Sequence, residues 1–510
     1  MSALERAIAR PQPVHGFGSR SPLDGLDRRS VGFADVLAQS VAAVAPSAAA
    51  TTVVLLVAGV AGSAAVLAVA VAGVLALLIA STINQFAKRM ATAGSIYTFV
   101  SKGLGSGAAV VAGAAIMIGY GFISVFALLG GAHYLTLLIS ALWPSFGGPL
   151  ATTATLAGQA AVLAIVLVRG IRLSSRLALV VELVSVAIIV ALFIALLVQI
   201  GPIDLSAIVA LDDLSAAGLA AGAVLALTAF VGFESAATLG VEARSPLRNI
   251  PRAIVGTVLV SAVLYVLAAY TQIAGFAALG QSFAQSTSPV NDLAGAFGAA
   301  QLGVLIDLGI TGSFLACAIA STTALTRLLF SMGRDGVAPR AFGKVHARHR
   351  TPIVAIGVAV PLVTLGSVLA VLTGNSPWEA MQSVIAISAT GYIVAYALVC
   401  IAAPVFLRRI GENTFASTLI AIVSTIALAG GLLIYLAYEG MRGNLGVTVA
   451  LVVAAIAACL VAWRLRRGAA SLAGIGTYDE PIAAHVLGGV NDAHRGRPPA
   501  RDASDSSPGV

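Results

Sequence analysis

The sequence predicts an all-α polytopic membrane protein with about twelve transmembrane helices, and three observations support this fold class. Hydrophobic residues make up 59% of the 510 residues, whereas charged residues make up only 10%. The apolar residues form runs of about 20 residues, which is the length that an α-helix needs to cross a bilayer. Lys and Arg residues fall mainly in short groups between these runs, as in cytoplasmic loops of membrane proteins. This composition excludes a water-soluble globular domain.

The apolar runs divide the chain into twelve predicted spans. In chain order they cover residues 33–59, 62–86, 106–139, 151–169, 177–200, 216–241, 253–276, 301–332, 352–372, 380–407, 414–438 and 444–463. If the N-terminus is cytoplasmic, every Lys and Arg except Arg442 falls on the cytoplasmic side. This asymmetry predicts a multi-pass protein of the inner (cytoplasmic) cell membrane with both termini in the cytoplasm. Scattered basic groups of this kind do not indicate a nucleic-acid partner.

Two of the predicted spans are interrupted halfway. In the sixth span, Gly232 and Glu234 stand at hydrocarbon depth, where a charged side chain costs at least ~2.5–3.5 kcal/mol and normally faces protein or a water-filled cavity. In the first span, Pro46 lacks a backbone N–H and Ser47 offers a hydroxyl group. For Pro46 alone, a simple proline kink is an alternative. Two broken helices five spans apart are typical of two five-helix repeats of opposite orientation.

These breaks define the expected organisation of the chain. We expect a polar cytoplasmic segment without a signal peptide at 1–32 and a disordered cytoplasmic tail, rich in Gly, Pro and Ser, at 468–510. Between them we expect transmembrane repeat one (helices 1–5) at 33–200, repeat two (helices 6–10) at 216–407, and helices 11–12 at 414–463.

The two breaks supply the groups that a small zwitterion needs. The free N–H groups and positive dipole end of a half-helix can hold a carboxylate, and freed carbonyl groups can hold an ammonium group or a cation. The first kind of contact is expected at Ala45, Pro46, Ser47 and Ala48. The second kind is expected at Val44, Thr228, Ala229 and Val231.

Three segments carry a resemblance to a known family. They are VGFESAATLGVEARSPLRNIPRAI (231–254), ATAGSIYTFVSKGLG (91–105) and TRLLFSMGRDGVAPRAFGKVHARHRTP (326–352). Together they resemble the amino acid–polyamine–organocation permeases, and the resemblance extends over helices 1 to 10. It implies a LeuT-type fold of two inverted five-helix repeats plus two C-terminal helices. It also implies uptake or exchange of amino acids or related amines by alternating access.

The resemblance also implies roles for individual residues. The backbone of residues 45–48 would hold the substrate carboxylate, and the carbonyl groups of Thr228 and Val231 would hold its amino group. The ring of Phe230 or Phe233 would form part of a lid over the substrate.

The sequence departs from the family pattern at two places. Many members have a Gly-Ser-Gly type break in helix 1, whereas this chain has Ala-Pro-Ser-Ala at 45–48, which implies a differently shaped carboxylate site. Some proton-coupled members carry a lysine in helix 5, and the matching position here is Ser185. The absence of that lysine weakens the hypothesis that a lysine in helix 5 carries the coupling proton in this chain.

Several polar residues within the spans are candidates for coupling or gating. They are Glu234, Glu182, Ser185, Asp307, Ser321 and Thr322. Carboxylates in a membrane are relay candidates and hydroxyl groups can ligate Na⁺, so a proton or sodium route between helices 1, 5 and 8 is one interpretation. Structural polar contacts between helices are the other. For Glu234, gating or proton sensing stands beside a fixed hydrogen bond that secures the helix break.

Aromatic and cysteine residues within the spans carry weaker indications. Tyr120 and Tyr392 are candidates for walls of the substrate pocket, although generic aromatic packing explains them equally well. Cys317, Cys400 and Cys459 lie in apolar runs without metal-ligand spacing, so we expect small buried side chains and no metal site.

The sequence therefore predicts a secondary permease for an amino acid or related small amine, with H⁺ or Na⁺ as coupling ion and no other cofactor. Exchange is an alternative, and a non-transporting sensor with the permease fold is a further one. An intramembrane enzyme is not expected, because the chain shows no HExxH motif, paired acids or Ser/His arrangement at membrane depth. A channel filter such as TVGYG is also absent. The expected partners are a small-molecule substrate and the bilayer, and the oligomeric state is not readable. Glu234 is the one acid evident at the broken segments, so nothing demands a cationic substrate and neutral or apolar amino acids are favoured.

Overall fold

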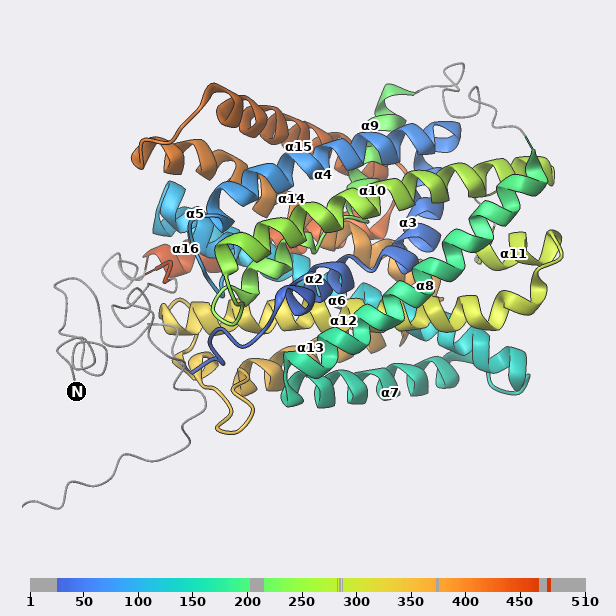
Figure 1. Ribbon diagram of the computed structural model, residues 1–510, viewed down its shortest axis with the longest axis horizontal. Helices are drawn as coiled ribbons and strands as arrows, with labels where there is room; N and C mark the ends of the chain where they lie inside the picture. Colours follow the sequence, from blue (N-terminus) through green and yellow to red (C-terminus); the bar gives the residue numbers. More distant parts are fainter. Residues whose placement is uncertain are drawn as a thin grey trace, which may run out of the picture.

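The computed structural model of the chain describes residues 25–201, 215–281, 283, 286, 288–372, 376–466 and 475–477. These residues form a bundle of long helices (Figure 1). Their bounds are α2 (Phe33–Val44), α3 (Pro46–Ala61), α4 (Ala65–Ala87), α5 (Ile96–Leu104), α6 (Ser106–Leu142), α7 (Gly148–Arg169), α8 (Ile171–Ile200), α9 (Ala216–Leu227), α10 (Pro246–Ala278), α11 (Pro289–Ala296), α12 (Gly303–Arg334), α13 (Ile353–Leu372), α14 (Pro377–Arg409), α15 (Phe415–Met441) and α16 (Leu445–Arg466), with a 3-10 helix η3 (Phe233–Leu239) after α9.

Eleven helical segments of the described chain are long and apolar enough to cross a membrane, and α2 and α3 together form the first of them. The predicted sixth span is missing from this set because its α-helical part, α9, has only 12 residues. At 1.5 Å per residue, α9 is about 18 Å long, which is shorter than the ~30 Å hydrocarbon core. The segment continues through an irregular turn into η3. Counted with the eleven longer segments, it brings the described chain to twelve spans, which agrees with the prediction.

One predicted boundary is wrong. The sequence predicts that the seventh span begins at residue 253, but α10 already begins at Pro246 and contains Pro251. Pro246 occupies the first helical position, where the N–H that proline lacks would have no partner within the helix in any case. The seventh span therefore begins before the predicted residue 253.

The centre of the bundle is formed by the first helix pair and by three long helices. Of the 18 consecutive residues that are most apolar in α2 and α3, 89% are buried, which is the largest buried share among the candidate spans. The long helix α6 packs against both α12 and α14. By contrast, only 22% of the most apolar stretch of α15 and 17% of that of α16 are buried. These two helices therefore lie at the edge of the bundle, with apolar faces suited to lipid.

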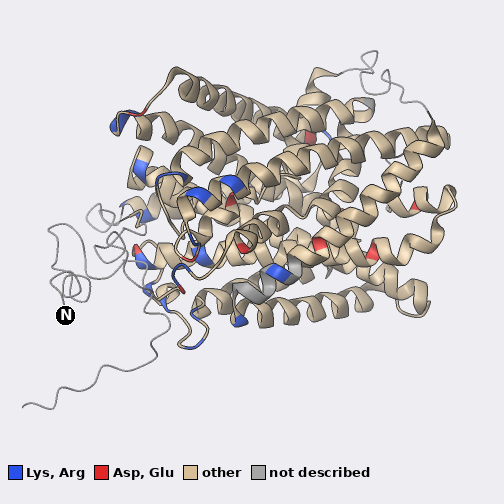
Figure 2. Cartoon of the chain, viewed as in Figure 1, with Lys and Arg blue, Asp and Glu red and all other residues tan. Residues whose placement is uncertain are grey.

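Lys and Arg residues gather at one end of the bundle (Figure 2). This basic end includes Lys88, Arg89, Arg244, Arg334 and Arg408. A buried ion pair closes it, because the Arg327 guanidinium donates from Nε and Nη2 to the two carboxylate oxygens of Glu242, each at 2.8 Å.

A second carboxylate, Asp335, ties several segments together at the basic end. The Tyr97 hydroxyl of α5 donates to Asp335 Oδ2 at 2.8 Å. Burial, and then the nearby Asp335 carboxylate, raise the pKa of Tyr97 above its ordinary value, so the phenol keeps the proton that it donates. The backbone N–H of Gly476 also donates to Asp335 Oδ2, at 2.8 Å. Residues 475–477 of the predicted tail are thus held against the bundle; the rest of 468–510 and residues 1–24 lie outside the described residues.

Candidate functional site

The first break separates α2 from α3. Ala45 stands between the two helices with φ 50°, in the left-handed region, and α3 begins directly with Pro46. Proline at the first position fits a helix start, because its missing N–H would have no acceptor there. The first span is therefore two half-helices rather than one kinked helix, and its break lies where the sequence predicts it.

A buried carboxylate from another helix occupies the start of α3. Glu182 of α8 accepts two hydrogen bonds on Oε1, from the Ser47 N–H at 2.8 Å and from the Ser47 hydroxyl at 2.7 Å. The next N–H, that of Ala48, donates to the Ser313 hydroxyl of α12 at 3.2 Å. The N–H groups expected to hold a substrate carboxylate thus hold side chains of α8 and α12. A helix N-terminus stabilises such a negative charge through its dipole and its free N–H groups.

The second break lies between α9 and η3, at residues 228–232. Gly232 has φ 103°, and a Cβ at this position would lie 2.8 Å from the Ala43 carbonyl oxygen of α2. Only glycine fits both the backbone conformation and this close approach. The two breaks are therefore in direct contact with each other in the middle of the bundle.

Glu234 fixes the second break through three hydrogen bonds. Its Oε2 accepts from the Gly232 N–H at 3.1 Å and from the Tyr396 hydroxyl at 2.5 Å, and its Oε1 accepts from the Tyr120 hydroxyl at 2.8 Å. The residue is fully buried. In this structure Glu234 makes fixed hydrogen bonds, which is one of the two interpretations of this residue in the sequence analysis.

A small cavity of about 20 Å³ lies between the two breaks. Its lining comes from both breaks and from α6, α12 and α14, and comprises Ala43, Val44, Ala45, Ala48, Ala49, Val53, Ile123, Phe126, Thr228, Ala229, Val231, Phe314, Cys317 and Ile385. Charged side chains are absent from this described lining, and Thr228 and Cys317 are its polar side chains. In this conformation the cavity has room for about one water molecule, and its apolar side chains stand beside backbone groups of the two breaks.

The sequence profile of the family described as "Amino acid permease" matches residues 35–468, which is most of the chain. The chain belongs to the amino acid permease family. Membership makes it a transporter of amino acids or related amines and not an enzyme. This permease is a multi-pass membrane protein of the amino acid–polyamine–organocation superfamily, as the segments 91–105, 231–254 and 326–352 predict.

Relatives of the permease include two branched-chain amino acid permeases and a putrescine importer. It is 26% identical over 356 residues to the branched-chain amino acid permease BcaP of Bacillus subtilis, covering 66% of this chain and 72% of the relative. BcaP of Lactococcus lactis is 26% identical over 390 residues, covering 72% and 80%. The low-affinity putrescine importer PlaP of Escherichia coli is 34% identical over 157 residues, covering 30% and 34%.

A solved structure confirms the fold of the permease. The crystal structure of MhsT in complex with L-phenylalanine, a transporter with the LeuT-type fold, superposes with a TM-score of 0.53. The sequences are 17% identical, and the match covers 80% of this chain and 99% of MhsT. The predicted fold class, two inverted five-helix repeats plus two C-terminal helices, is therefore confirmed.

The aromatic residues predicted for the lid and walls of the pocket lie beside the central cavity of the permease rather than in it. The Phe230 ring packs edge-on against Tyr265 with ring centres 4.9 Å apart, and the Phe233 ring stacks on Tyr396 at 5.6 Å. Tyr120 and Tyr392 pack against each other at 5.5 Å, next to Glu234. These rings surround the hydrogen bonds of Glu234 at the second break.

The remaining coupling candidates lie at different places around the first break. The Ser185 hydroxyl bonds within α8 to the Val181 carbonyl at 2.8 Å, and Asp307 accepts from Asn291 of α11 at 2.6 Å. The Thr322 hydroxyl donates to Ser124 of α6 at 3.1 Å, while Ser321 is buried one turn from Cys317. Among the six candidates, Glu182 therefore contacts the start of α3, and Glu234 contacts the second break.

Some residues of the site were not predicted. Ser313 and Cys317 stand four residues apart on α12, followed by Ser321, and this spacing places all three on one helix face. That face was a usable signal in the sequence, as was the four-residue spacing of Tyr392 and Tyr396. The prediction for the cysteines is confirmed for Cys317 and Cys400, which are buried, and is wrong for Cys459, which is exposed on the outer helix α16.

Proposed function

We propose that the permease is a secondary active transporter of neutral amino acids with apolar side chains, which it binds between the two breaks and moves by alternating access. The observation that carries this proposal is the central cavity, where apolar side chains surround the backbone of residues 43–49 and 228–231. The two BcaP relatives, which are named as branched-chain amino acid permeases, support the same substrate class.

The coupling ion in this proposal is a proton carried by Glu182. Glu182 is fully buried between α8, α3 and α12, and both of its hydrogen bonds fall on Oε1. Its Oε2 makes no hydrogen bond among the described residues, and the Ser313 hydroxyl lies beside the carboxylate. Protonation removes the charge that holds Glu182 at the start of α3, and the Ser47 N–H then becomes available to a substrate carboxylate. Proton and substrate thereby enter the site together, because the two carboxylates compete for one helix terminus.

The same contact also favours a second candidate, an importer or exchanger of small amines. A substrate without a carboxylate leaves the bonds between Glu182 and Ser47 intact and uses only the carbonyl groups of the breaks. Relatedness to PlaP, which is named as a putrescine importer, supports this alternative over part of the chain.

Uptake into proteoliposomes tests these proposals. Purified permease is supplied with radiolabelled L-leucine, L-alanine or putrescine, under a proton gradient, a sodium gradient or neither. We expect saturable, proton-driven accumulation of L-leucine; putrescine uptake alone would establish the amine candidate, and sodium dependence would reject Glu182 as the carrier.

The variant Glu182→Gln tests coupling directly. We expect it to lower proton-driven accumulation of L-leucine at least about tenfold, while leucine exchange between the two sides continues, because the amide neither carries the charge nor takes up the proton. Glu412→Gln, the same chemical change at an exposed residue of the basic end, is the matched control. Proton-driven accumulation by Glu182→Gln equal to that of the control would refute the role of Glu182.

We further propose that the basic end faces the cytoplasm of the cell membrane, with both termini there, because Lys and Arg retain cytoplasmic loops. Cysteines placed singly at exposed Glu412 and exposed Met441, on a Cys459→Ser background, test the orientation with a membrane-impermeant thiol reagent. In intact cells, we expect labelling at position 441 and none at position 412. The reverse pattern would invert the topology.

A further inference from the structure

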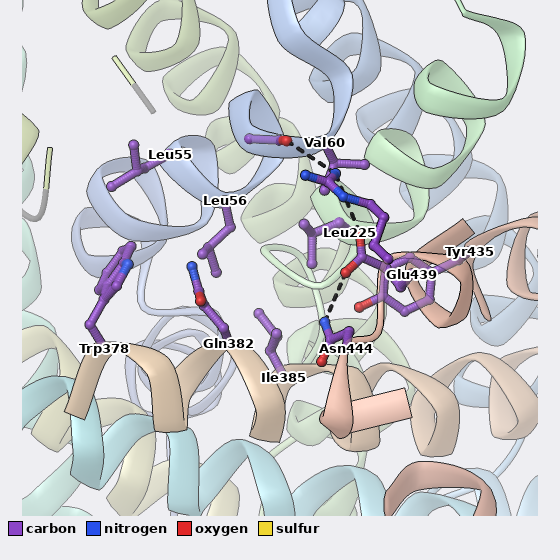
Figure 3. Close-up of a pocket in the computed structure, with 12 residues that line it drawn as sticks. Leu55, Leu56, Val60, Leu225, Trp378, Gln382, Ile385, Tyr435, Glu439 and Asn444 are labelled. Carbon is purple, nitrogen blue, oxygen red and sulfur yellow. Dashed lines mark hydrogen bonds and ion pairs between the residues drawn. The ribbon is translucent and has the colours of Figure 1, made fainter. Parts of the chain in front are cut away.

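A second and larger cavity, of about 270 Å³, lies between α3, α9, α14 and α15 (Figure 3). It lies at the end of the bundle opposite the basic end, beside the connection from α3 to α4 and the connection from α15 to α16. Its volume equals that of about nine water molecules at ~30 Å³ each. The cavity therefore has room for an amino acid of the size of leucine.

Two opposite charges stand on one side of this cavity, and both come from the end of α15. The carboxylate of Glu439, a residue only 8% exposed, accepts a hydrogen bond on Oε2 from the Asn444 amide at 2.8 Å. Its Oε1 is buried, and no described donor lies within hydrogen-bond distance, because the Arg442 Nη1 is 3.9 Å away. A buried carboxylate oxygen without a donor is costly, so this atom is a ready acceptor for an ammonium group.

Arg442 supplies the complementary charge at the rim of the cavity. Its side chain is 52% exposed, and Nη1 makes one long hydrogen bond, 3.4 Å, to the Gly59 carbonyl of α3. A guanidinium group presents five N–H donors in a plane that matches a carboxylate. Arg442 is also the one Lys or Arg that the sequence places on the side opposite the basic residues. Its guanidinium lies over the Tyr438 ring, with 5.6 Å to the ring centre, and its Nη1 is 3.9 Å from Glu439 Oε1.

The remaining wall of the cavity is mixed, with Gln382 of α14 and Tyr435 of α15 beside apolar side chains. The apolar part is formed by Leu55 and Leu56 of α3, Leu225 of α9 and Ile385 of α14 (Figure 3). Ile385 lines both this cavity and the small central cavity. The two cavities are therefore neighbours in series, and a solute leaving the larger one toward the centre passes Ile385.

We propose that the larger cavity is a second binding site for a zwitterionic amino acid with an apolar side chain, occupied before the central site. The ammonium group of the amino acid binds Glu439 Oε1, its carboxylate binds Arg442, and its side chain contacts Leu56 and Leu225. The choice of an amino acid as ligand rests on the proposed transport function, whereas the charge pair and the cavity do not.

Trp378 provides a local probe for this site, because it lines the larger cavity. The protein has 3 Trp residues, so the double substitution Trp143→Phe and Trp463→Phe leaves Trp378 as the only fluorophore of its kind. Titration of the purified full-length protein with L-leucine should change the Trp378 emission saturably. We expect Glu439→Gln to weaken the apparent affinity at least about tenfold, and Glu439→Asp to weaken it less.

Asp292→Asn is the matched control, since it removes an exposed carboxylate that bonds Ser286 and lies outside the cavity. We expect its titration to match that of the parent. An absent Trp378 response at leucine concentrations that saturate uptake, or an equal response in Glu439→Gln and the parent, would overturn the proposal.

A second measurement separates binding in the larger cavity from a conformational signal that starts at the central cavity. Ala49→Val narrows the central cavity, to which Ala49 contributes, and should lower uptake at least about tenfold while leaving the Trp378 titration in place. Loss of the Trp378 response in Ala49→Val would assign the signal to the central site and overturn the proposal. Equilibrium dialysis gives an independent result without that variant: we expect two leucines bound per parent protein and one per Glu439→Gln protein, and equal stoichiometries would contradict the second site.

The outcomes for this site and for transport are distinguishable. Leucine uptake without a Trp378 response overturns the second site and leaves the transport function standing. A Trp378 response that depends on Glu439, without any leucine uptake, has the opposite meaning.

Discussion

Each of the two helix breaks is held by a buried glutamate, but the two glutamates are held in different ways. Glu234 stands two residues after Gly232 in the same segment, and both of its oxygens accept hydrogen bonds, from one backbone N–H and two tyrosines. Glu182 reaches the first break from α8, 135 positions away from Ser47, and both of its bonds fall on one oxygen. The second break is thus secured locally, whereas the first depends on a contact between helices.

This difference indicates which break can change state. Releasing Glu234 leaves three buried donors without an acceptor, at about 1–3 kcal/mol for each. Releasing Glu182 frees only the hydroxyl and the N–H of Ser47, and a substrate carboxylate can replace it there. The second break is therefore expected to behave as a fixed part of the structure, and the first as the part that responds to protons and substrate.

The largest effect is expected from Glu234→Ala. The substitution removes the acceptor of Gly232, Tyr120 and Tyr396, so we expect a loss of several kcal/mol of stability, at about 1–3 kcal/mol per unsatisfied group. Thermal unfolding in detergent, followed by size-exclusion chromatography, measures it. Glu234→Gln keeps one acceptor oxygen and should lose less. Equal stability of Glu234→Ala and the parent would show that Glu234 does not secure the break.

The next largest effect is expected from Gly232→Ala. A non-glycine residue at φ 103° is strained by about 1–2 kcal/mol, and the added Cβ would clash with the Ala43 carbonyl oxygen at 2.8 Å. We expect lower thermal stability and at least about a tenfold fall in uptake. Gly256→Ala in α10, where an added Cβ meets nothing within 4 Å, is the control and should behave like the parent. Full activity of Gly232→Ala would mean that the two breaks need not lie in contact.

A smaller effect is expected from Tyr396→Phe. It removes one of the three donors to Glu234 and leaves the ring stacked on Phe233, so the loss should be about 1–2 kcal/mol of stability, typical of one hydrogen bond to a charged group. Uptake should keep its dependence on the proton gradient. A change in that dependence at unchanged stability would assign coupling to the second break instead of the first.

The smallest effect is expected from Ser47→Ala. The Ser47 N–H still donates to Glu182, and only the hydroxyl bond of 2.7 Å is lost. Because one hydrogen bond contributes about 1 kcal/mol, we expect a change of about fivefold in the substrate concentration for half-maximal uptake, with little change in thermal stability. Kinetics of leucine uptake check this. A loss of stability as large as that of Glu234→Ala would make the two breaks alike.

The sequence predicts the fold and the position of both breaks because the signals are local. Pro46 and Gly232 interrupt apolar runs, and Glu234 marks the second break as a buried charged position. These features need no knowledge of how the helices pack. The contact between Glu182 and Ser47 depends on the rotation and depth of α8 relative to α3, which a single sequence does not specify. Glu234 belongs to a broken segment itself, whereas Glu182 reaches the first break from another helix.

Side-chain directions at the second break were equally out of reach of the sequence. Phe230 and Phe233 lie within the irregular segment around Gly232, where helical periodicity no longer indicates which way a side chain points. The ring of Phe230 packs on Tyr265 of α10 because the backbone turns there. The larger cavity was missed because Glu439 and Arg442 lie at the end of α15. This helix lies outside the two repeats, and the resemblance assigns it no role.

The shortness of α9 has a consequence for topology. Eleven spans counted by length in the described chain form an odd number, which would set the two ends of the polypeptide on opposite faces of a membrane. The start of the first span and the end of the last span nevertheless lie on one face, at the basic end. The Val31 N–H, just before α2, donates to the Glu242 carbonyl. Arg464, near the end of α16, donates to the Gly336 carbonyl. Parity is restored only by counting the helix that is too short to be recognised. Reporter fusions at the C-terminus would therefore be assigned to the wrong compartment by any census that sets a minimum span length, and the helix lost in that census is one that builds the site.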